Sequence, residues 1–494
     1  MSDISRRDFL KKGSAALAGL TIAPTIVPNT VLGKKYNHKA PSDKLNILGV
    51  GVGGRGFSDL KEMETENIIG LCDVDWKYAK HVFDHYPTAK TFNDYRKMYD
   101  EMLPQADAVV VATADHTHAI VAADAMTAGK HVYVEKPLTL YVYESRLLAK
   151  LAKKYKVATQ MGNQGASMAG TRKAINWLWN GEIGEVKRIE AYTNRPIWPQ
   201  GLPKPTEAQK IPSTMNWEAF IGPAKMRDYN EIYTPWNFRG WWDFGSGALG
   251  DMANHILQTA FMGLNLGYPD RVLGSSTMLM TDSCPTAEMV TYHFPARPNM
   301  PKLALPECEL TWYDGGIVNK LPFDMPKGKK FDGNGVCVFY GTKDTMVVGT
   351  YGNQPFLVSG REPIVPELCR IVPNDNHQQD WIRACKEPAD SRVETASCFA
   401  LSGPLNETVV MGVVAVRLQE LGQWLDWDGE NMKFTNIPAD AKVRPSNEIK
   451  FSIKDGHPTF KNNDTTPMDA NEYAANLIKP IYYNGYKLPE IPVL

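Results

Sequence analysis

A glycine-rich turn after the first apolar run constrains this chain more than any other feature. The run Leu45–Val50 leads into four glycines and one arginine, at Gly51, Gly53, Gly54, Arg55 and Gly56. The next apolar run, Ile68–Cys72, ends at the acidic residue Asp73. A strand, a tight glycine turn and a helix, with a carboxylate closing the second strand, are typical of a dinucleotide-binding βαβ unit.

Each residue of the turn has an expected role. Gly51 permits the tight turn, Gly53 lets the backbone approach a pyrophosphate, and Gly56 lets the helix pack closely on the sheet. The helix N-terminus offers free N–H groups to the phosphates. Asp73 is expected to bind ribose hydroxyls and to repel a 2′-phosphate, which favours NAD over NADP. Arg55 weakens this preference, because its side chain could reach such a phosphate.

The pattern of apolar runs divides the chain. Residues 40–161 alternate short apolar runs with helical stretches, which predicts a parallel sheet of the Rossmann type. Strand-like runs recur over residues 162–436, which predicts an α+β domain with a mostly antiparallel sheet and a long helix at Leu405–Trp424. Residues 437–494 are polar and proline-rich and are expected to wrap the surface. The predicted fold class is therefore α/β.

The N-terminus reads as an export signal. Ser5–Lys12 contains Arg6 and Arg7 in a twin-arginine pattern, and a short, weakly apolar stretch interrupted by Gly and Pro follows. We expect residues 1–34 to be a signal peptide read by the twin-arginine translocase, which places the mature protein in the periplasm or outside the cell. The stretch is too short for a stable membrane anchor, and no later segment is predicted to span a membrane.

The net charge and the cysteine spacing give no case for a nucleic-acid partner or a metal site. The 494 residues carry a net charge of −1, which gives no reason to expect nucleic acid as a partner. The seven cysteines are scattered without metal-like spacing. No metal site is expected, and most of the cysteines are predicted to be small buried residues.

Two later strand ends carry polar residues of the same pocket. The run ending at Ala112 is followed by Thr113, His116 and His118, which could line the ribose and nicotinamide pocket. The two histidines could equally cap and pack the next helix. Glu135 and Lys136, followed by a proline, close the fifth strand, where a nicotinamide ring would lie.

A second polar pair lies far along the chain. Asp251 and His255 are four residues apart and share one face of a predicted helix. Oxidation of a secondary alcohol needs a base for the hydroxyl proton, which suits His255, whereas the Lys136 ammonium would stabilise the developing alkoxide. Asp251 could bind the substrate hydroxyl or orient the imidazole, and the identity of the base stays open. Alternatively, the pair caps and packs its helix.

A third group is predicted to face a carbohydrate. Indole rings stack on the C–H faces of sugar rings, and amides and guanidinium groups bind the hydroxyls. The candidates are Asn163, Gln164, Arg195, Trp198, Trp236, Arg239, Trp241 and Trp242. Any one of these tryptophans could instead belong to the core of a long loop. His377 is a weaker candidate, because it could simply begin a helix.

Together the glycine turn, the Asp-His-Thr-His stretch, Glu-Lys-Pro and Asp-x-x-x-His resemble, in order, the glucose–fructose oxidoreductase/inositol dehydrogenase (Gfo/Idh/MocA) family over residues 44–430. The resemblance implies a Rossmann domain followed by an α/β domain with a large open sheet, which often makes oligomer contacts. It implies catalytic roles for Lys136, Asp251 and His255. It also implies a tightly held nicotinamide and a homo-oligomer, either a dimer or a tetramer.

Three functions fit these features. The first is an exported NAD(P)-dependent oxidoreductase acting on a hydroxyl of a sugar, sugar derivative or glycoside. The second is a redox-neutral glycoside hydrolase of the same family, in which bound NAD is reduced and reoxidised within one cycle. The third is a non-catalytic sugar-binding protein on the same fold.

Overall fold

The computed structural model describes residues 43–462 and 465–493, and within them a six-stranded parallel sheet runs in the order β3-β2-β1-β4-β5-β6. Its strands are β1 (Asn46–Val50), β2 (Asn67–Cys72), β3 (Lys90–Phe92), β4 (Ala108–Val111), β5 (His131–Val134) and β6 (Thr159–Met161). Every residue of β4 is buried, as expected for a central strand covered on both faces. The predicted Rossmann sheet is confirmed.

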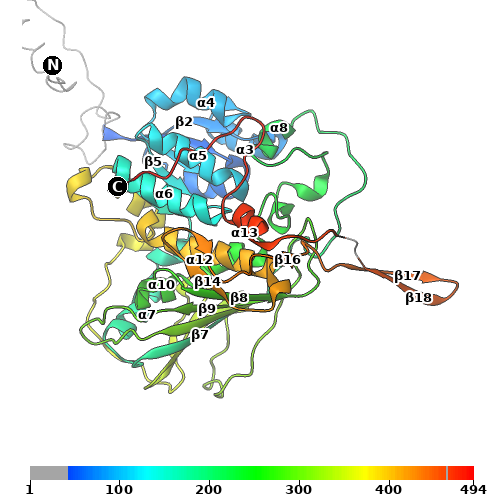
Figure 1. Cartoon of the computed structure of the whole chain (residues 1–494). Helices are drawn as coiled ribbons and strands as arrows, with labels where there is room; N and C mark the ends of the chain where they lie inside the picture. The colour runs from blue at the N-terminus through cyan, green and yellow to red at the C-terminus, as the bar shows by residue number, and fades with distance from the viewer. Residues whose placement is uncertain (1–42, 463–464, 494) are drawn as a thin grey trace, which may run out of the picture. The chain divides into compact units, whose positions relative to one another are not determined.

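Helices connect these strands (Figure 1). They are α2 (Phe57–Lys61), α3 (Trp76–His85), α4 (Tyr95–Met102), α5 (Asp115–Thr127) and α6 (Val142–Tyr155). The carboxylates of Asp75 and Asp94 accept hydrogen bonds from backbone N–H groups in the first turns of α3 and α4. Such caps satisfy N–H groups that have no partner inside the helix, so the two aspartates determine where these helices begin.

A nine-stranded sheet forms the second part of the described chain, in the order β13-β12-β11-β7-β10-β9-β8-β14-β15. The strands are β7 (Val186–Thr193), β8 (Arg271–Ser276), β9 (Glu288–Phe294), β10 (Cys308–Tyr313), β11 (Gly335–Gly341), β12 (Thr345–Gly349), β13 (Phe356–Leu357), β14 (Leu425–Asp428) and β15 (Lys433–Phe434). The neighbours β7 and β10 are parallel and the other neighbours are antiparallel. The mostly antiparallel sheet is therefore also confirmed.

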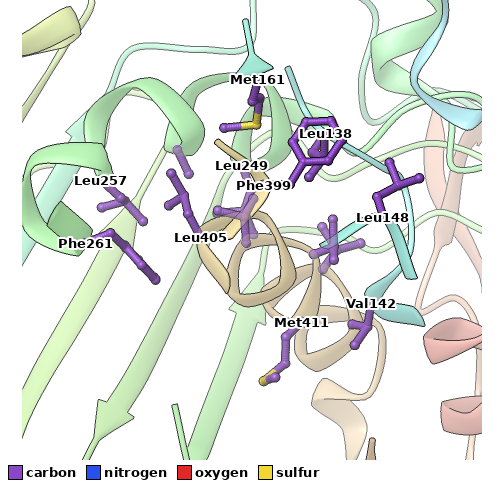
Figure 2. Packing of buried hydrophobic residues seen from close by; sticks show 14 of the residues in the cluster. Leu138, Val142, Leu148, Met161, Leu249, Leu257, Phe261, Phe399, Leu405 and Met411 are labelled. Atoms are coloured by element: carbon purple, nitrogen blue, oxygen red, sulfur yellow. The ribbon is translucent and has the colours of Figure 1, made fainter. Parts of the chain in front are cut away.

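Six further α-helices of the described chain lie, in sequence, between β6 and the C-terminal segment. They are α7 (Ala169–Trp179), α8 (Trp217–Ile221), α9 (Gly247–Ile256), α10 (Gln258–Leu264), α11 (His377–Cys385) and α12 (Phe399–Arg417). α12 packs against α6, α9 and strand β8. Figure 2 shows its side chains Leu405 and Met411 among residues of both parts of the chain, including Leu138 and Leu249. One hydrophobic core therefore joins the two sheets.

The position of α12 corrects a prediction. The sequence predicts a helix at Leu405–Trp424, whereas the helix covers Phe399–Arg417 with Pro404 inside it. Prolines favour the first turn of a helix, but here a full turn precedes this one. The helix ends at Arg417, and a short 3-10 turn at Gln419–Leu421 follows, which Gly422 closes in the left-handed conformation before β14. By length and composition α12 could cross a membrane, but 78% of its apolar window is buried in the protein.

The C-terminal segment does more than the predicted wrapping of the surface. Its helix α13 (Ala470–Ile478) buries Ala470, Tyr473 and Leu477 in the main core. The short strands β16 (Lys442–Val443) and β19 (Met468–Asp469) pair with each other, and the hairpin of β17 (Ile449–Lys454) and β18 (His457–Asn462) lies between them in the chain. All seven cysteines of the chain are buried, as predicted for most of them, and all are free.

Candidate active site

A cavity of about 390 Å³ lies at the carboxyl ends of the central parallel strands. On the side of the first sheet it is lined by Gly51, Gly54, Asp73, Thr113 and Lys136, among others. The opposite wall comes from later segments and consists of Ala219, Phe220, Thr234, Pro235, Trp236, Phe238, Arg239 and Tyr486. Open parallel sheets bind ligands at this edge, so the cavity is the candidate cofactor site.

The turn after β1 has the geometry that two of its glycines predict. Gly51 adopts a φ of +78°, and a Cβ there would lie 2.6 Å from the main-chain carbonyl after β4, so only glycine fits. At Gly56 a Cβ would overlap the carbonyl oxygen of Gly51, which explains the close approach of the helix. A Cβ at Gly53 or at Gly54 would meet the Tyr78 side chain, which lines the cavity together with Gly54, and the role of Gly53 toward a pyrophosphate stays a prediction.

Asp73 and Arg55 point in different directions. Asp73 Oδ2 accepts a hydrogen bond from the backbone N–H of Gly53 at 2.8 Å. Burial raises the pKa of Asp73 to about 6, although such N–H donors oppose the shift. The Arg55 guanidinium instead contacts Asp59 at 2.9 Å and Glu135 at 3.3 Å. Arg55 is therefore bound by one carboxylate on α2 and by another that directly follows β5.

Lys136 meets α9 beside the cavity. Its Nζ lies 2.6 Å from Asp251 Oδ1, and Arg239 Nε lies 2.9 Å from the same oxygen. Burial alone would raise the pKa of Asp251, but the two cations outweigh burial and hold this pKa well below its usual range. Asp251 is therefore a carboxylate at neutral pH, and it holds both cations at the site.

His255 lies one turn beyond Asp251 on α9, and neither side chain is among the residues that line the cavity, although both lie next to Lys136, which does. His255 Nδ1 is buried and has no hydrogen-bond partner within the described chain. The edge of its ring contacts Tyr351, with centroids 4.7 Å apart. Burial, and then the charge of Lys136, lower the pKa of His255 well below 6.5. The imidazole is therefore uncharged at neutral pH.

Several residues of the site were not predicted. Asp115 lines the cavity beside the cation cluster, and burial raises its pKa to about 7, with Arg239 opposing. The Asp-His-Thr-His stretch, which begins at Asp115, indicates that the pocket lies here, but its histidines are the residues predicted to line it. Tyr351 has a φ of +62°, which is unusual for a residue with a Cβ. Tyr78, Phe220 and Tyr486 also line the cavity, and no local pattern marks them.

His116 and His118 lie outside the cavity lining, in contrast to their predicted position. Both are buried in the first turns of α5. His116 Nε2 lies 2.9 Å from the carbonyl oxygen of Phe220, and the ring nitrogens of His118 lie 2.8 and 3.1 Å from those of Pro137 and Thr113. Burial lowers the pKa of each to about 4. They pack the helix start, which was the alternative interpretation.

The structure separates the predicted tryptophans. Trp236 is half exposed, lines the cavity and stacks under the Arg239 guanidinium at 4.1 Å. Trp198 is buried beside it, with the ring centroids 6.4 Å apart. Trp241 and Trp242 are buried, and their Nε1 groups donate to backbone carbonyls. These two are core residues of the loop rather than parts of a sugar-binding face.

The predicted amides, Asn163 and Gln164, and Arg195 lie in three different surroundings. Gln164 Nε2 donates to Glu135 Oε1 at 3.1 Å, which places it beside the site. Asn163 is buried and donates to Gln258 Oε1 at 3.1 Å. Arg195 bonds to neighbouring asparagine side chains and does not line the cavity.

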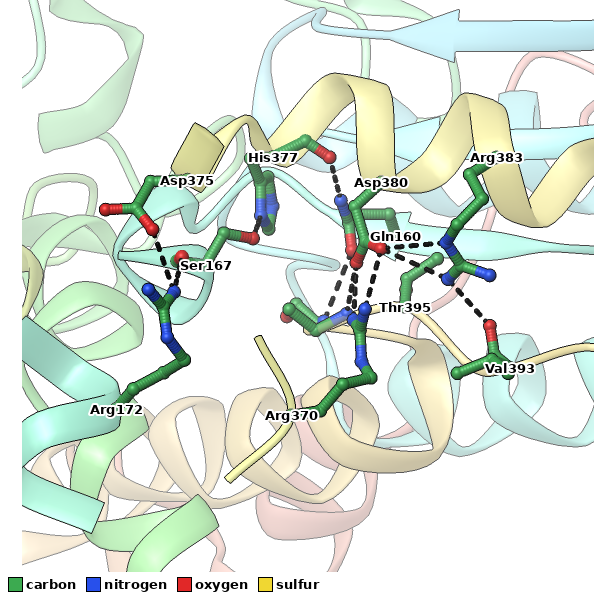
Figure 3. A network of polar contacts seen from close by, with 12 residues as sticks. Gln160, Ser167, Arg172, Arg370, Asp375, His377, Asp380, Arg383, Val393 and Thr395 are labelled. Carbon is green, nitrogen blue, oxygen red and sulfur yellow. Dashed lines mark hydrogen bonds and ion pairs between the residues drawn. The ribbon is translucent and has the colours of Figure 1, made fainter. Parts of the chain in front are cut away.

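His377 belongs to a separate polar network (Figure 3). Its Nε2 lies 2.8 Å from the carbonyl oxygen of Met161, and its Nδ1 lies 2.6 Å from Ser167 Oγ. One turn along α11, the Asp380 carboxylate binds Arg370 and Arg383. His377 therefore joins α11 to the end of β6 and does not line the cavity.

Two family models match the chain in domain order. The description "Oxidoreductase family, NAD-binding Rossmann fold" matches residues 44–163, and "Oxidoreductase family, C-terminal alpha/beta domain" matches residues 185–295. Curated relatives include "Glycosyl hydrolase family 109 protein 1" of Shewanella sp. (strain ANA-3), 30% identical over 213 residues. "Alpha-N-acetylgalactosaminidase" of Shewanella oneidensis is 29% identical over the same length. Each match covers 39% of this chain and 46% of the relative, so it spans about half of the relatives' length.

Solved structures share the fold at low identity. An inositol dehydrogenase homolog from Azotobacter vinelandii, complexed with NADH and myo-inositol, aligns with a TM-score of 0.54 and 14% identity, covering 78% of this chain and 98% of that chain. The WlbA dehydrogenase from Bordetella pertussis, in complex with NADH and UDP-GlcNAcA, aligns with a TM-score of 0.52 and 14% identity, covering 78% and 99%. These similarities establish the fold.

Proposed function

The chain belongs to the Gfo/Idh/MocA oxidoreductase family, and on this basis we propose that it transfers hydride between NAD and a hydroxyl of a sugar, sugar derivative or glycoside. The observation that carries the proposal is the cluster of Lys136, Asp251 and Arg239, which sets two cations and one carboxylate beside the cofactor cavity. Charges held in this way suit a reaction in which negative charge develops on a substrate oxygen.

The residues of the cavity fit a dinucleotide. The turn at Gly51–Gly54 opens a short helical segment at the cavity, where N–H groups other than those of Gly51 and Gly53, which bind the Cys72 carbonyl and Asp73, would meet the phosphates. Asp73 stands at the end of β2, where a carboxylate would receive ribose hydroxyls. Since Arg55 is engaged by Asp59 and Glu135, no cation of the turn faces a 2′-phosphate, and NAD is expected to bind more tightly than NADP. Bound NAD supplies the hydride acceptor.

The side chains divide the remaining chemistry. The Lys136 ammonium donates a hydrogen bond to the reacting oxygen and stabilises its developing charge. Asp251 orients that ammonium through the 2.6 Å ion pair. His255, uncharged at neutral pH, accepts the hydroxyl proton. The exposed face of Trp236 at the cavity offers a stacking surface for the ring of a sugar.

The proposal is tested on purified protein that has not been dialysed. The absorbance band of reduced nicotinamide is recorded before and after the addition of a panel of sugars and glycosides. Growth of the band with one sugar identifies the substrate class. If no nicotinamide is bound, even after incubation with NAD or NADP, the proposal fails.

The glycosyl hydrolase relatives favour a second candidate. In a redox-neutral cycle, oxidation of a glycoside hydroxyl to a ketone would allow elimination of the aglycone as its alcohol, water would add to the resulting unsaturated ketone, and return of the hydride would restore the hydroxyl and regenerate NAD. Release of nitrophenol from a nitrophenyl glycoside, with bound NAD unchanged at the end, supports this candidate. Accumulation of reduced nicotinamide without release of nitrophenol supports net oxidation.

We also propose that the cofactor is held tightly, with the C-terminal segment as a clasp. Asn484 Nδ2 donates to the carbonyl oxygens of Gly222 and Ala224, at 2.8 and 2.9 Å. These residues follow α8, whose Phe220 lines the cavity. Nearby in the chain, Tyr486 also lines the cavity. The C-terminal segment is therefore bonded to the loop that follows α8, beside the part of the cavity wall that Phe220 forms.

Loss of the clasp is expected to accelerate cofactor release. Asn484→Ala removes two hydrogen bonds, each contributing about 1 kcal/mol, so bound nicotinamide should leave roughly 30-fold faster. The measurement is the time course of nicotinamide loss into a scavenging NAD-dependent enzyme. Asn471→Ala is the matched control, because its Nδ2 bonds to the carbonyl oxygen of Pro438 on an exposed part of the same segment. Equal release rates in the two variants would contradict the clasp.

Export through the twin-arginine translocase is proposed from Ser5–Lys12, which lies outside the described residues. We expect a change of Arg6→Lys together with Arg7→Lys to retain the protein in the cytoplasm, because the translocase reads the arginine pair. The measurement is cell fractionation followed by immunoblotting. Continued export of the double variant would exclude this route.

A further inference from the structure

The hairpin of β17 and β18 leaves the body of the protein as an arm (Figure 1). Every residue of both strands is exposed. The base of the arm is fixed, because the Asn447 N–H donates to the carbonyl oxygen of Leu279, and the Leu279 N–H donates to Asn447 Oδ1 at 2.6 Å. After the arm, β19 returns to pair with β16. The arm is therefore anchored at both ends and surrounded by solvent along its length.

The two faces of the arm differ in chemistry. Pairing places Phe451 opposite Phe460, with ring centroids 5.5 Å apart. Together with Ile449 and Ile453 they form one apolar face whose residues are 51–69% exposed. The other face consists of polar residues, namely Lys450, Ser452, Lys454, His457, Thr459 and Lys461. Isolated two-stranded hairpins are marginal in water, and a contiguous exposed apolar face marks an interaction surface.

The distribution of charge argues against a lipid surface as the partner. The tip of the arm, residues 454–457, reads Lys-Asp-Gly-His, so it carries no apolar group to enter a membrane. Lys450 and Lys454 lie on the face opposite the phenylalanines and would point away from anionic headgroups if the apolar face entered the bilayer. Membrane-binding amphipathic elements instead bring their basic groups to the headgroup level. The apolar face fits a protein surface, with the lysines left in water.

We propose that the arm is a dimerisation device, whose apolar face lies on a second copy of this chain while the arm of that copy lies on the first. The available area favours this reciprocal arrangement. At the stated exposed fractions, each of the four apolar side chains exposes roughly 100 Å² of surface that a partner could cover. One arm and the surface beneath it would then bury roughly 800 Å², below the 1,200–2,000 Å² or so of a specific interface. Two arms exchanged about a two-fold axis bury roughly 1,600 Å², which suffices.

The test is sedimentation equilibrium of the full chain over a range of concentrations, with two matched variants. Phe451→Ser with Ile453→Ser removes apolar side chains from one face of β17. Lys450→Ser with Lys454→Ser changes the same strand on the opposite face. We expect a wild-type dimer, a lysine variant that stays dimeric, and an apolar-face variant whose dimer dissociation constant rises at least about 100-fold. Thermal melting confirms that both variants fold, since neither touches the core.

Three results would overturn the proposal. The wild-type protein could be monomeric at micromolar concentration. Its oligomer could be equally stable in both variants, which would place the interface elsewhere. The third is co-sedimentation of the wild-type protein with phosphatidylglycerol vesicles that is lost only in the apolar-face variant, which would assign the arm to a membrane. All three readouts are independent of NAD and of turnover, so the proposed reaction stands or falls separately.

Discussion

Replacing Lys136 by Met is expected to lower the rate of hydride transfer by roughly 100- to 1,000-fold while leaving bound nicotinamide in place. Methionine keeps an unbranched chain but removes the ammonium that lies 2.6 Å from Asp251 Oδ1. Arg239 remains to neutralise that carboxylate at 2.9 Å, so the site loses its donor to the substrate oxygen without leaving a buried charge unpaired. The measurement is single-turnover reduction of bound NAD by the substrate that the sugar panel identifies.

Lys130→Met is the matched control for this variant. Lys130 directly precedes β5, at the strand end opposite Lys136, and its Nζ donates to the carbonyl oxygen of Ala106 at 2.8 Å. It does not line the cavity, so its loss should leave turnover unchanged. If Lys136→Met keeps near-normal turnover, the cation cluster is not the catalytic site. If neither protein turns over any sugar but both bind one equally, the non-catalytic binding protein becomes the better hypothesis.

The first sheet could be predicted because its signals are local. The glycines at Gly51 and Gly56 satisfy steric demands of neighbouring backbone, and such demands leave a mark at fixed spacing. Strand β4 is a continuous apolar run because both of its faces are covered. The same locality explains why Lys136 was found, since it closes a strand whose end must face the ligand edge.

The residues that prediction missed or misplaced depend on distant contacts. Trp241 and Trp236 have similar sequence surroundings, yet one is fully buried and the other half exposed, because the loop folds back on α8 and its own aromatic cluster. Tyr486 reaches the cavity from the end of the chain. Tyr78 reaches the cavity from α3 and packs beside Gly53 and Gly54. None of these outcomes has a periodic or local signature.

Replacing His255 by Asn is expected to lower kcat by roughly 100- to 10,000-fold, because the variant loses its proton acceptor. In the wild-type protein the pKa of His255 is held well below 6.5 by burial and by Lys136. The accepting, uncharged form therefore persists as the pH falls through about 6.5, where an ordinary histidine would be half protonated. We expect kcat/KM to stay level from about pH 8 to 6.5 and to fall only at more acid pH. A fall centred near the ordinary value would contradict this assignment.

His118→Asn separates this catalytic loss from a structural one. Both histidines are buried with lowered pKa values, but His118 has hydrogen-bonding carbonyls beside both ring nitrogens, whereas Nδ1 of His255 has no partner in the described chain. Loss of His118 should therefore leave a buried carbonyl unpaired and lower the free energy of unfolding by about 1–3 kcal/mol. Loss of His255 should leave the melting temperature nearly unchanged while lowering kcat by roughly 100- to 10,000-fold. The opposite pattern would place the proton acceptor elsewhere and make His255 a packing residue.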